Sequence, residues 1–135
     1  MGKRISRSEA RREAFKLIFC LNQHTDELDF LFENLIEECP EAEGAMPYIK
    51  EVVSGVLAHY DELLGIIGAN LKEGWTVERI SKTSRAILLL AVYEIKYVGD
   101  VPEKVAVNEA VELAKAFDEP SSAAFVNGVL AGVLK

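Results

Sequence analysis

Residues 1–19 combine basic and aromatic side chains in a pattern that could bind nucleic acid. The first sixteen residues contain six Lys or Arg residues against two glutamates, whereas the whole chain of 135 residues has a formal net charge of -7. A short basic segment on an acidic chain suggests contact with a polyanion. The six basic residues are Lys3, Arg4, Arg7, Arg11, Arg12 and Lys16.

Two phenylalanines follow the arginines at helical spacing. Arg11, Phe15 and Phe19 recur every four residues, so a helix would place these side chains along one flank. Cations beside exposed aromatic rings offer phosphate contacts and stacking surfaces, which is what unpaired RNA bases require. Phe15 could instead widen the apolar core, and Phe19 is therefore the better stacking candidate.

Two other interpretations of the basic segment stay open. It could be a solvated terminus that aids only solubility, or a helix that meets an anionic membrane surface. We favour nucleic acid over both. Single strands are favoured over duplex, because six cations interrupted by two glutamates make a small electrostatic footprint and phenylalanine rings have no use in a groove-filling basic helix.

The remaining residues show no pattern typical of an enzyme. His24 and His59 have no Cys, His or carboxylate at metal-site spacing, and the scattered glycines lack the Lys-Ser/Thr that completes a phosphate loop. Glu109 and Glu112 are close on a helix, but in an acidic chain such pairs usually form a solvated face. We therefore expect a protein without a metal ion, a cofactor or catalysis of its own.

The cysteines and the start of the chain indicate the compartment. Cys20 and Cys39 stand in apolar or acidic surroundings, and we expect reduced structural thiols. The basic start leads into an amphipathic segment and not into the continuous apolar run of a signal peptide. A cytoplasmic protein is the expectation.

The longest apolar run predicts a buried helix. Seven apolar residues follow one another from Ala86 to Val92. A helix that is apolar on every side must be covered by other elements or by lipid, and seven residues are far short of the roughly 20 that cross a bilayer. We expect residues 85–98 to form the central helix of an all-helical protein.

Apolar residues at steps of three and four predict about seven helices in total, and no period-two alternation predicts a sheet. Ser6 and Glu9 have the spacing of a capping box for the first helix, and Ser81 should cap the central one. One long helix or two meeting near Tyr60 would fit residues 47–71. We expect a solvated loop at residues 37–43. The other predicted helices cover residues 7–21, 28–36, 105–117 and 122–134.

The short connections favour antiparallel neighbours. The predicted fold class is all-α, with about seven helices in two small helical bundles packed around a central buried helix. A chain of this length fits one domain, and we expect a single domain over residues 1–135.

Four motifs occur in an order and spacing that together are specific. They are ARREAF at residues 10–15, W-x-x-x-R-I with R-x-x-L-x-x-A-x-Y-E through residues 75–94, DVPEKVAVNEAVELAKAF at residues 100–117 and FVNGVL at residues 125–130. With them, the chain resembles the family of the bacterial transcription antitermination factor NusB over nearly its whole length.

The resemblance implies a non-enzymatic, all-helical RNA-binding factor. Such a factor would bind boxA-type single-stranded RNA together with the ribosomal protein NusE. It would act with the transcription elongation complex and support processive transcription of ribosomal RNA operons. The free protein could be a monomer, or a homodimer through the first helix and its flank.

The resemblance also implies positions for the two binding surfaces. RNA would contact the arginine-rich start and, at a second edge, the segment from Phe117 to Phe125. The partner protein would contact the region before the central helix, at Glu78 and Lys82. The RNA-binding residues would be Lys3, Arg4, Arg7, Arg11, Arg12, Lys16, Phe19, Phe117, Ser121 and Phe125.

Two residues depart from the family pattern at the second edge. Family members often have Gly after the aromatic residue that Phe117 matches, and a basic residue just before the one that Phe125 matches. This chain has Asp118 and Ala124 there. Both changes lower the positive charge, so we expect the second edge to bind RNA more weakly than the N-terminal surface.

Two alternative functions differ from the leading one. The chain could be a protein–protein adaptor whose basic start is incidental, or an RNA-binding accessory domain like the related domain fused to RNA cytosine methyltransferases. The second alternative is poor for this chain, because we find no methyl-donor-binding motif and expect no room for such a domain.

Overall fold

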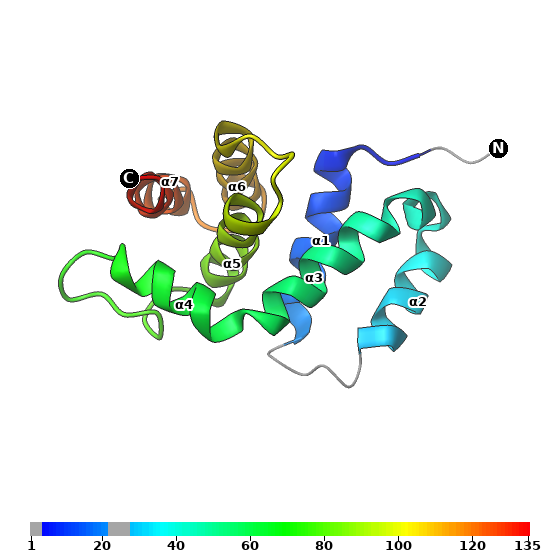
Figure 1. Ribbon diagram of the computed structural model, residues 1–135, viewed down its shortest axis with the longest axis horizontal. Coiled ribbons are helices and arrows are strands. Elements are labelled where there is room, and N and C mark those ends of the chain that lie inside the picture. Colours follow the sequence, from blue (N-terminus) through cyan, green and yellow to red (C-terminus); the bar gives the residue numbers. More distant parts are fainter. Residues whose placement is uncertain (1–3, 22–27) are drawn as a thin grey trace. The chain divides into compact units, whose positions relative to one another are not determined.

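Seven α-helices and one short 3-10 helix form the described part of the chain, residues 4–21 and 28–135, in this computed structural model (Figure 1). These residues contain no strand. The all-α prediction is therefore confirmed. The elements are α1 (Arg7–Leu21), α2 (Leu28–Glu38), η1 (Pro40–Ala45), α3 (Met46–Ala58), α4 (Tyr60–Ala69), α5 (Lys82–Tyr97), α6 (Glu103–Phe117) and α7 (Ser122–Val133).

Side-chain caps fix the starts of α1 and α5. The backbone N–H of Glu9 donates to Ser6 Oγ (3.0 Å), and the backbone N–H of Ser6 donates to Glu9 Oε1 (2.8 Å). This reciprocal pair is the capping box that the spacing predicts. Ser81 Oγ accepts the backbone N–H of Ser84 at 3.0 Å. Both predicted caps are confirmed.

The acidic segment after α2 is more ordered than the sequence predicts. We expected a solvated loop at residues 37–43, but α2 continues to Glu38 and Pro40–Ala45 forms η1. Pro40 suits the first turn because its fixed φ is helical and its missing N–H has no helical partner there. Ala42 is fully buried, which anchors the turn while the neighbouring glutamates stay exposed.

The chain divides into two compact units, Met1–Ala58 and His59–Lys135. The boundary falls where the sequence left one long helix or two helices open. Helix α3 ends at Ala58, and α4 begins at Tyr60 with His59 as its N-cap residue. The two-helix alternative is confirmed.

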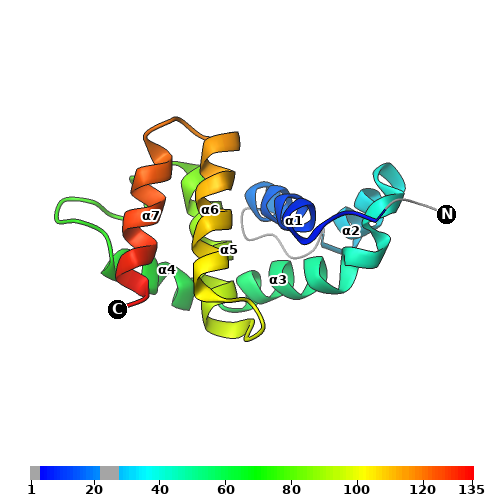
Figure 2. The ribbon, with the colours of Figure 1, turned by 90° about the horizontal axis from the view of Figure 1, so that it is seen from above.

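In the first unit, α1 packs against α3, and η1 contacts α1, α2 and α3 (Figure 2). The predicted stripe of α1 is buried at Ala10, Ala14 and Ile18. On α3, the residues with no exposed surface are Ile49, Val52, Val53 and Val56. Apolar packing of α1 on α3 therefore holds the basic start of α1 in place.

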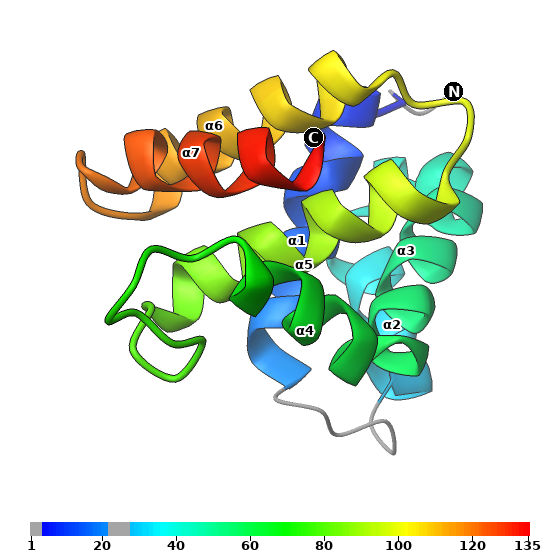
Figure 3. The same cartoon turned by 60° about the vertical axis from the view of Figure 1, so that its left-hand side comes forward.

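In the second unit, α5 contacts α4, α6 and α7, and α6 lies antiparallel to α7 (Figures 2 and 3). Every residue from Ala86 to Glu94 is buried, as expected for a helix covered on all sides. The prediction of a buried central segment is confirmed. Within the described residues, no single helix is long and apolar enough to cross a membrane. The segments Pro40–Ala58 and Tyr60–Ala69 are long and apolar enough only when they are taken together, and a break at His59 separates them.

Truncating the buried helix should weaken the fold. Leu90 is 1% exposed, so Leu90→Ala should lower the free energy of unfolding by about 2–5 kcal/mol through reduced burial and a residual cavity. Val105→Ala on α6 is the control. Val105 is 42% exposed, and we expect a change within about 0.5 kcal/mol. Chemical denaturation measures both, and equal destabilisation would contradict the assignment of α5 as the core helix.

Candidate nucleic-acid interface

The first unit presents arginines at the start of α1. Arg4, Arg7 and Arg12 are exposed. The guanidinium carbon of Arg7 lies 4.2 Å from the ring centroid of Tyr48, a buried residue of α3. A guanidinium on an aromatic face gains cation–π attraction and keeps its donors directed to solvent. Tyr48 thus restrains Arg7 at the surface.

The flank of α1 formed by Arg11, Phe15 and Phe19 is partly buried. Arg11 and Phe15 are each 3% exposed, whereas Phe19 is half-buried. The ring centroids of Phe15 and Phe19 are 6.2 Å apart. The alternative that Phe15 widens the core is confirmed. Arg11 lies near the ring of Tyr48 as well, at 5.7 Å from its centroid, so its guanidinium faces protein.

Lys16 and two glutamates, Glu13 and Glu41, also belong to this surface. Lys16 Nζ is 2.9 Å from Glu13 Oε2, in a pair that remains accessible to solvent. Exposed pairs of this kind contribute about 0–1 kcal/mol, so a phosphate can compete for the ammonium. Arg4 and Arg7 line a pocket of about 260 Å³ together with Glu41 of η1. Lys3, also predicted for this surface, lies outside the described residues.

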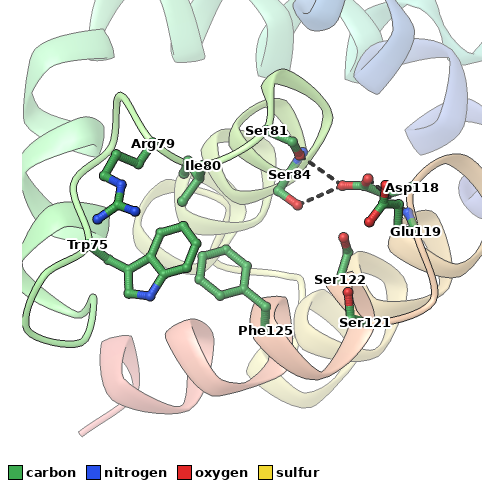
Figure 4. A pocket seen from close by; sticks show the side chains of 10 residues that line it. All are labelled: Trp75, Arg79, Ile80, Ser81, Ser84, Asp118, Glu119, Ser121, Ser122 and Phe125. Carbon is green, nitrogen blue, oxygen red and sulfur yellow. Dashed lines mark hydrogen bonds between the residues drawn. The ribbon is translucent and has the colours of Figure 1, made fainter.

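The second unit contains a pocket between the start of α5 and the α6–α7 connection (Figure 4). Its volume is about 350 Å³. The structure brings two predicted RNA residues, Ser121 and Phe125, into its lining. Phe117, the last residue of α6, does not line it but is 40% exposed. The lining residues are Trp75, Arg79, Ile80, Ser81, Ser84, Asp118, Glu119, Ser121, Ser122 and Phe125.

Aromatic rings form one side of this pocket. The rings of Trp75 and Phe125 have centroids 6.0 Å apart and are tilted by 44° (Figure 4). Trp75 is 46% exposed. The guanidinium carbon of Arg79 lies 5.1 Å from the Trp75 centroid, and Arg79 Nη1 donates to the carbonyl oxygen of Gly74 at 2.6 Å. Gly74 has φ of 89°, which favours glycine and turns the chain into Trp75.

The Asp118 carboxylate joins the α6–α7 connection to the start of α5. Asp118 Oδ2 accepts the hydroxyls of Ser84 (2.7 Å) and Ser81 (3.0 Å), and Oδ1 accepts the backbone N–H of Glu119 (2.8 Å). Partial burial raises the pKa of Asp118, but the hydrogen bonds from Ser84, Glu119 and Ser81 outweigh it, and the pKa lies below its ordinary value. Asp118, which in the sequence is a departure from the family pattern, thus has a structural role.

A lysine from another part of the chain lies beside the second departure. Lys72 lines a pocket of about 400 Å³ together with Ala124 and Phe125. Ala124 occupies the position where the family pattern suggests a basic residue. Lys72 therefore places a positive charge beside Ala124, where the sequence predicted a missing one.

The predicted partner-protein residues flank the segment that leads into α5. Glu78 lies in a turn in which the backbone N–H of Arg79 donates to the carbonyl oxygen of Thr76 at 3.0 Å. Lys82 is the first residue of α5. Both side chains are exposed.

The described residues offer no cluster suited to a metal ion. No group of three or more His, Cys, Asp or Glu side chains is placed to hold one in this part of the chain. His59 instead stacks on Tyr97, with centroids 4.3 Å apart, and its Nδ1 lies 3.1 Å from Glu62 Oε1. Cys20 and Cys39 are free thiols. His24 lies outside the described residues.

Comparison with known proteins identifies the family. The model of the NusB family matches residues 8–135. This chain belongs to the NusB family. The transcription antitermination protein NusB of Levilactobacillus brevis is 43% identical over 132 residues, which cover 96% of this chain and 93% of the relative.

Solved structures agree with this family assignment. T. maritima NusB superposes with a TM-score of 0.85 at 29% identity, covering 96% of this chain and 91% of the other. A structure described as antitermination factors NusB and NusE in complex with dsRNA gives a TM-score of 0.82 at 26% identity, covering 94% of each chain. The resemblance seen in the four sequence motifs is confirmed as family membership.

Four residues that shape these surfaces had no predicted binding role. Tyr48 lies under Arg7, Trp75 and Arg79 line the aromatic side of the pocket in Figure 4, and Lys72 lies beside Ala124. For Trp75 and Arg79 the sequence does contain an indication of their contact. Arg79 follows Trp75 by four residues in a turn that begins after Gly74, and this spacing allows a cation–π contact. Tyr48 and Lys72 are far in sequence from Arg7 and Ala124, beside which they lie, so the sequence gives no indication of these contacts.

The hydrogen bonds to Asp118 predict a pH-dependent stability. The pKa of Asp118 is lowered in the folded state, so the carboxylate stabilises the fold at pH values above its unfolded pKa of about 3.9. This stabilisation is lost as the pH falls through the folded pKa. Asp118→Asn should therefore lower Tm at neutral pH, and its difference from wild type should shrink below about pH 4. Thermal melts across pH measure this.

Asp100→Asn is the matched control, because Asp100 is exposed and lies outside the pocket lining. A constant difference between wild type and Asp118→Asn down to acid pH would contradict the role given to the carboxylate.

Proposed function

We propose that this chain is a transcription antitermination factor that binds boxA-type single-stranded RNA together with NusE. In this role it would act with the transcription elongation complex and support processive transcription of ribosomal RNA operons. The observation that carries the proposal is the exposed arginine surface at the start of α1, in a chain whose match to the NusB family covers residues 8–135. Relatives at 43% and 42% identity are named transcription antitermination protein NusB.

The first unit supports RNA contact through charge held on a rigid helix. Arg4, Arg7 and Arg12 are exposed cations, and Lys16 is paired only at the surface. Phe19 keeps part of its ring accessible beside them. Phosphate contacts to such cations supply most of the affinity of a sequence-tolerant RNA surface. Lys3 and Arg11 remain proposed contacts, and Arg11 would have to leave the Tyr48 ring to reach a phosphate.

The second unit supports a further RNA edge at the end of α6 and the start of α7. Phe117 and Phe125 expose ring surface, and Ser121 is exposed between them in sequence. Lys72 offsets part of the charge that Ala124 does not provide. Asp118 keeps its negative charge, but two serine hydroxyls and a backbone N–H direct their partial positive charges at it, which reduces its repulsion of a nearby phosphate.

The proposed protein partner is NusE. The solved assembly of a structural neighbour contains NusB, NusE and double-stranded RNA, and it supports a ternary complex for this chain. Exposed Glu78 and Lys82 are the proposed NusE contacts. We propose single-stranded RNA for function because partly exposed rings at Phe19, Phe117 and Phe125 suit unstacked bases. Duplex RNA is the comparison ligand.

The remaining expectations follow from this role. The protein would work in the cytoplasm, without a cofactor or catalysis of its own. A homodimer formed through α1 would cover the proposed RNA surface. Size measurements on the free protein and on its RNA complex would therefore show whether RNA displaces a dimer.

Reversing two exposed charges tests the proposal. Arg4→Glu combined with Arg12→Glu should weaken boxA-type RNA binding roughly tenfold or more, and should reduce the salt dependence of log K by about 0.7 for each phosphate that is no longer neutralised. Fluorescence anisotropy with labelled single-stranded and duplex RNA, with and without NusE, measures this. Arg11 is left intact because it is buried.

Lys104→Glu on α6 is the matched control, since Lys104 is exposed and lies in neither proposed surface. Unchanged affinity in the Arg4/Arg12 variant would show the site assignment to be wrong. If the wild-type chain bound NusE but no RNA, and the Arg4/Arg12 variant bound NusE with the same affinity as wild type, the protein–protein adaptor would be favoured instead.

A further inference from the structure

The pocket in Figure 4 has two walls of different chemistry. Trp75 and Phe125 form an apolar aromatic wall, with Arg79 beside Trp75. Opposite them, Ser81, Ser84 and Ser122 surround Asp118. A ligand in this space would meet a flat π surface on one side and polar oxygens on the other.

Asp118 fixes the polarity of the hydroxyl wall. Ser81 and Ser84 both donate their hydroxyl hydrogens to Asp118 Oδ2, and the backbone N–H of Glu119 donates to Oδ1. The Ser122 hydroxyl contributes to lowering the pKa of Asp118 in the same way. A hydroxyl has one hydrogen and two lone pairs, so each of these serines has only acceptor capacity left for a ligand. The wall is therefore acceptor-rich.

The charge of the pocket determines which part of a nucleotide can enter. Arg79 is the single cation in its lining, and Asp118 and Glu119 are both acidic. A phosphate deep in the pocket would be repelled by the two carboxylates. A neutral base with N–H groups on its edge would not, because its partial positive charge faces the acceptors.

We propose that this pocket holds one unpaired RNA base, placed against the Trp75–Phe125 wall with its donor edge toward the serines, and that it favours guanine over uracil. Guanine presents an N–H and an amino group side by side, whereas uracil presents one N–H between two carbonyl oxygens. A volume of about 350 Å³ is sufficient for one base. The inference rests on the proposed RNA-binding function and adds a base preference and two residues, Trp75 and Ser84, to it.

Trp75 provides a direct signal for the test, because it is the single tryptophan of the chain. A base that packs on the indole should quench its fluorescence. The probes are short oligouridines that carry one central guanine, one central inosine or no substitution. Inosine lacks the amino group of guanine and keeps the ring N–H. Each probe also carries a terminal label, so that anisotropy reports binding independently of Trp75.

We expect the guanine probe to bind roughly tenfold more tightly than oligouridine, with inosine between them, since a good pair of base-edge hydrogen bonds discriminates by about that much. Quenching should follow the same order. Ser84→Ala should reduce the guanine preference, while Trp75→Ala should weaken all probes and Trp75→Phe should restore most of the binding. Phe30→Ala, at a 66% exposed ring on α2, is the control for removal of an exposed aromatic side chain, and thermal melts verify folding of every variant.

Four outcomes would overturn the inference. Equal affinity for the guanine and uridine probes removes the base preference. Anisotropy that reports binding while Trp75 fluorescence is unchanged places the RNA elsewhere and leaves the proposed function standing. Abolished NusE binding in Trp75→Ala with intact RNA affinity makes the pocket a protein contact. If no probe and no boxA-type RNA binds wild type, with or without NusE, both this inference and the proposed function fail.

Discussion

The second unit depends on one carboxylate that joins distant parts of the chain. Asp118 accepts the hydroxyl of Ser81, the N-cap residue of α5, the hydroxyl of Ser84 in its first turn, and the backbone N–H of Glu119, so the α6–α7 connection is tied to the start of the buried helix. The serine hydroxyls and Phe125 gain their relative positions from this joint and from the packing of α5, α6 and α7, and the Trp75 ring lies beside Phe125. A hydrogen-bonded charge of this kind costs desolvation but specifies geometry.

Packing and binding use largely different residues in the first unit. The stripe of α1 and the valines of α3 are buried, while Arg4, Arg7 and Arg12, in and just before α1, extend into solvent. Tyr48 connects the two roles, because its ring is buried and its face meets the Arg7 guanidinium. Substitutions at the exposed arginines can therefore alter charge without altering the core.

The helices followed from the sequence because their signals are local. The capping box at Ser6 and Glu9, the serine cap at Ser81 and the apolar run from Ala86 each involve residues within a few positions. The geometry of the candidate site could not be predicted from the sequence, because it depends on contacts between residues far apart in the chain. Asp118 looked only like a reduction in positive charge, since its partners Ser81 and Ser84 are more than thirty residues away. Burial of Arg11 and the turn at Pro40–Ala45 likewise depend on tertiary packing that periodicity does not report.

The central claim is that RNA lies on the basic start of α1 and on the corner between α6 and α7. Photo-crosslinking of boxA-type RNA to the wild-type chain with NusE, followed by mass spectrometry of the crosslinked peptides, tests it most directly. We predict crosslinks at Phe19 and in the segment from Phe117 to Phe125. Crosslinks confined to α2 or to the exposed face of α3, with neither predicted segment labelled, would contradict it.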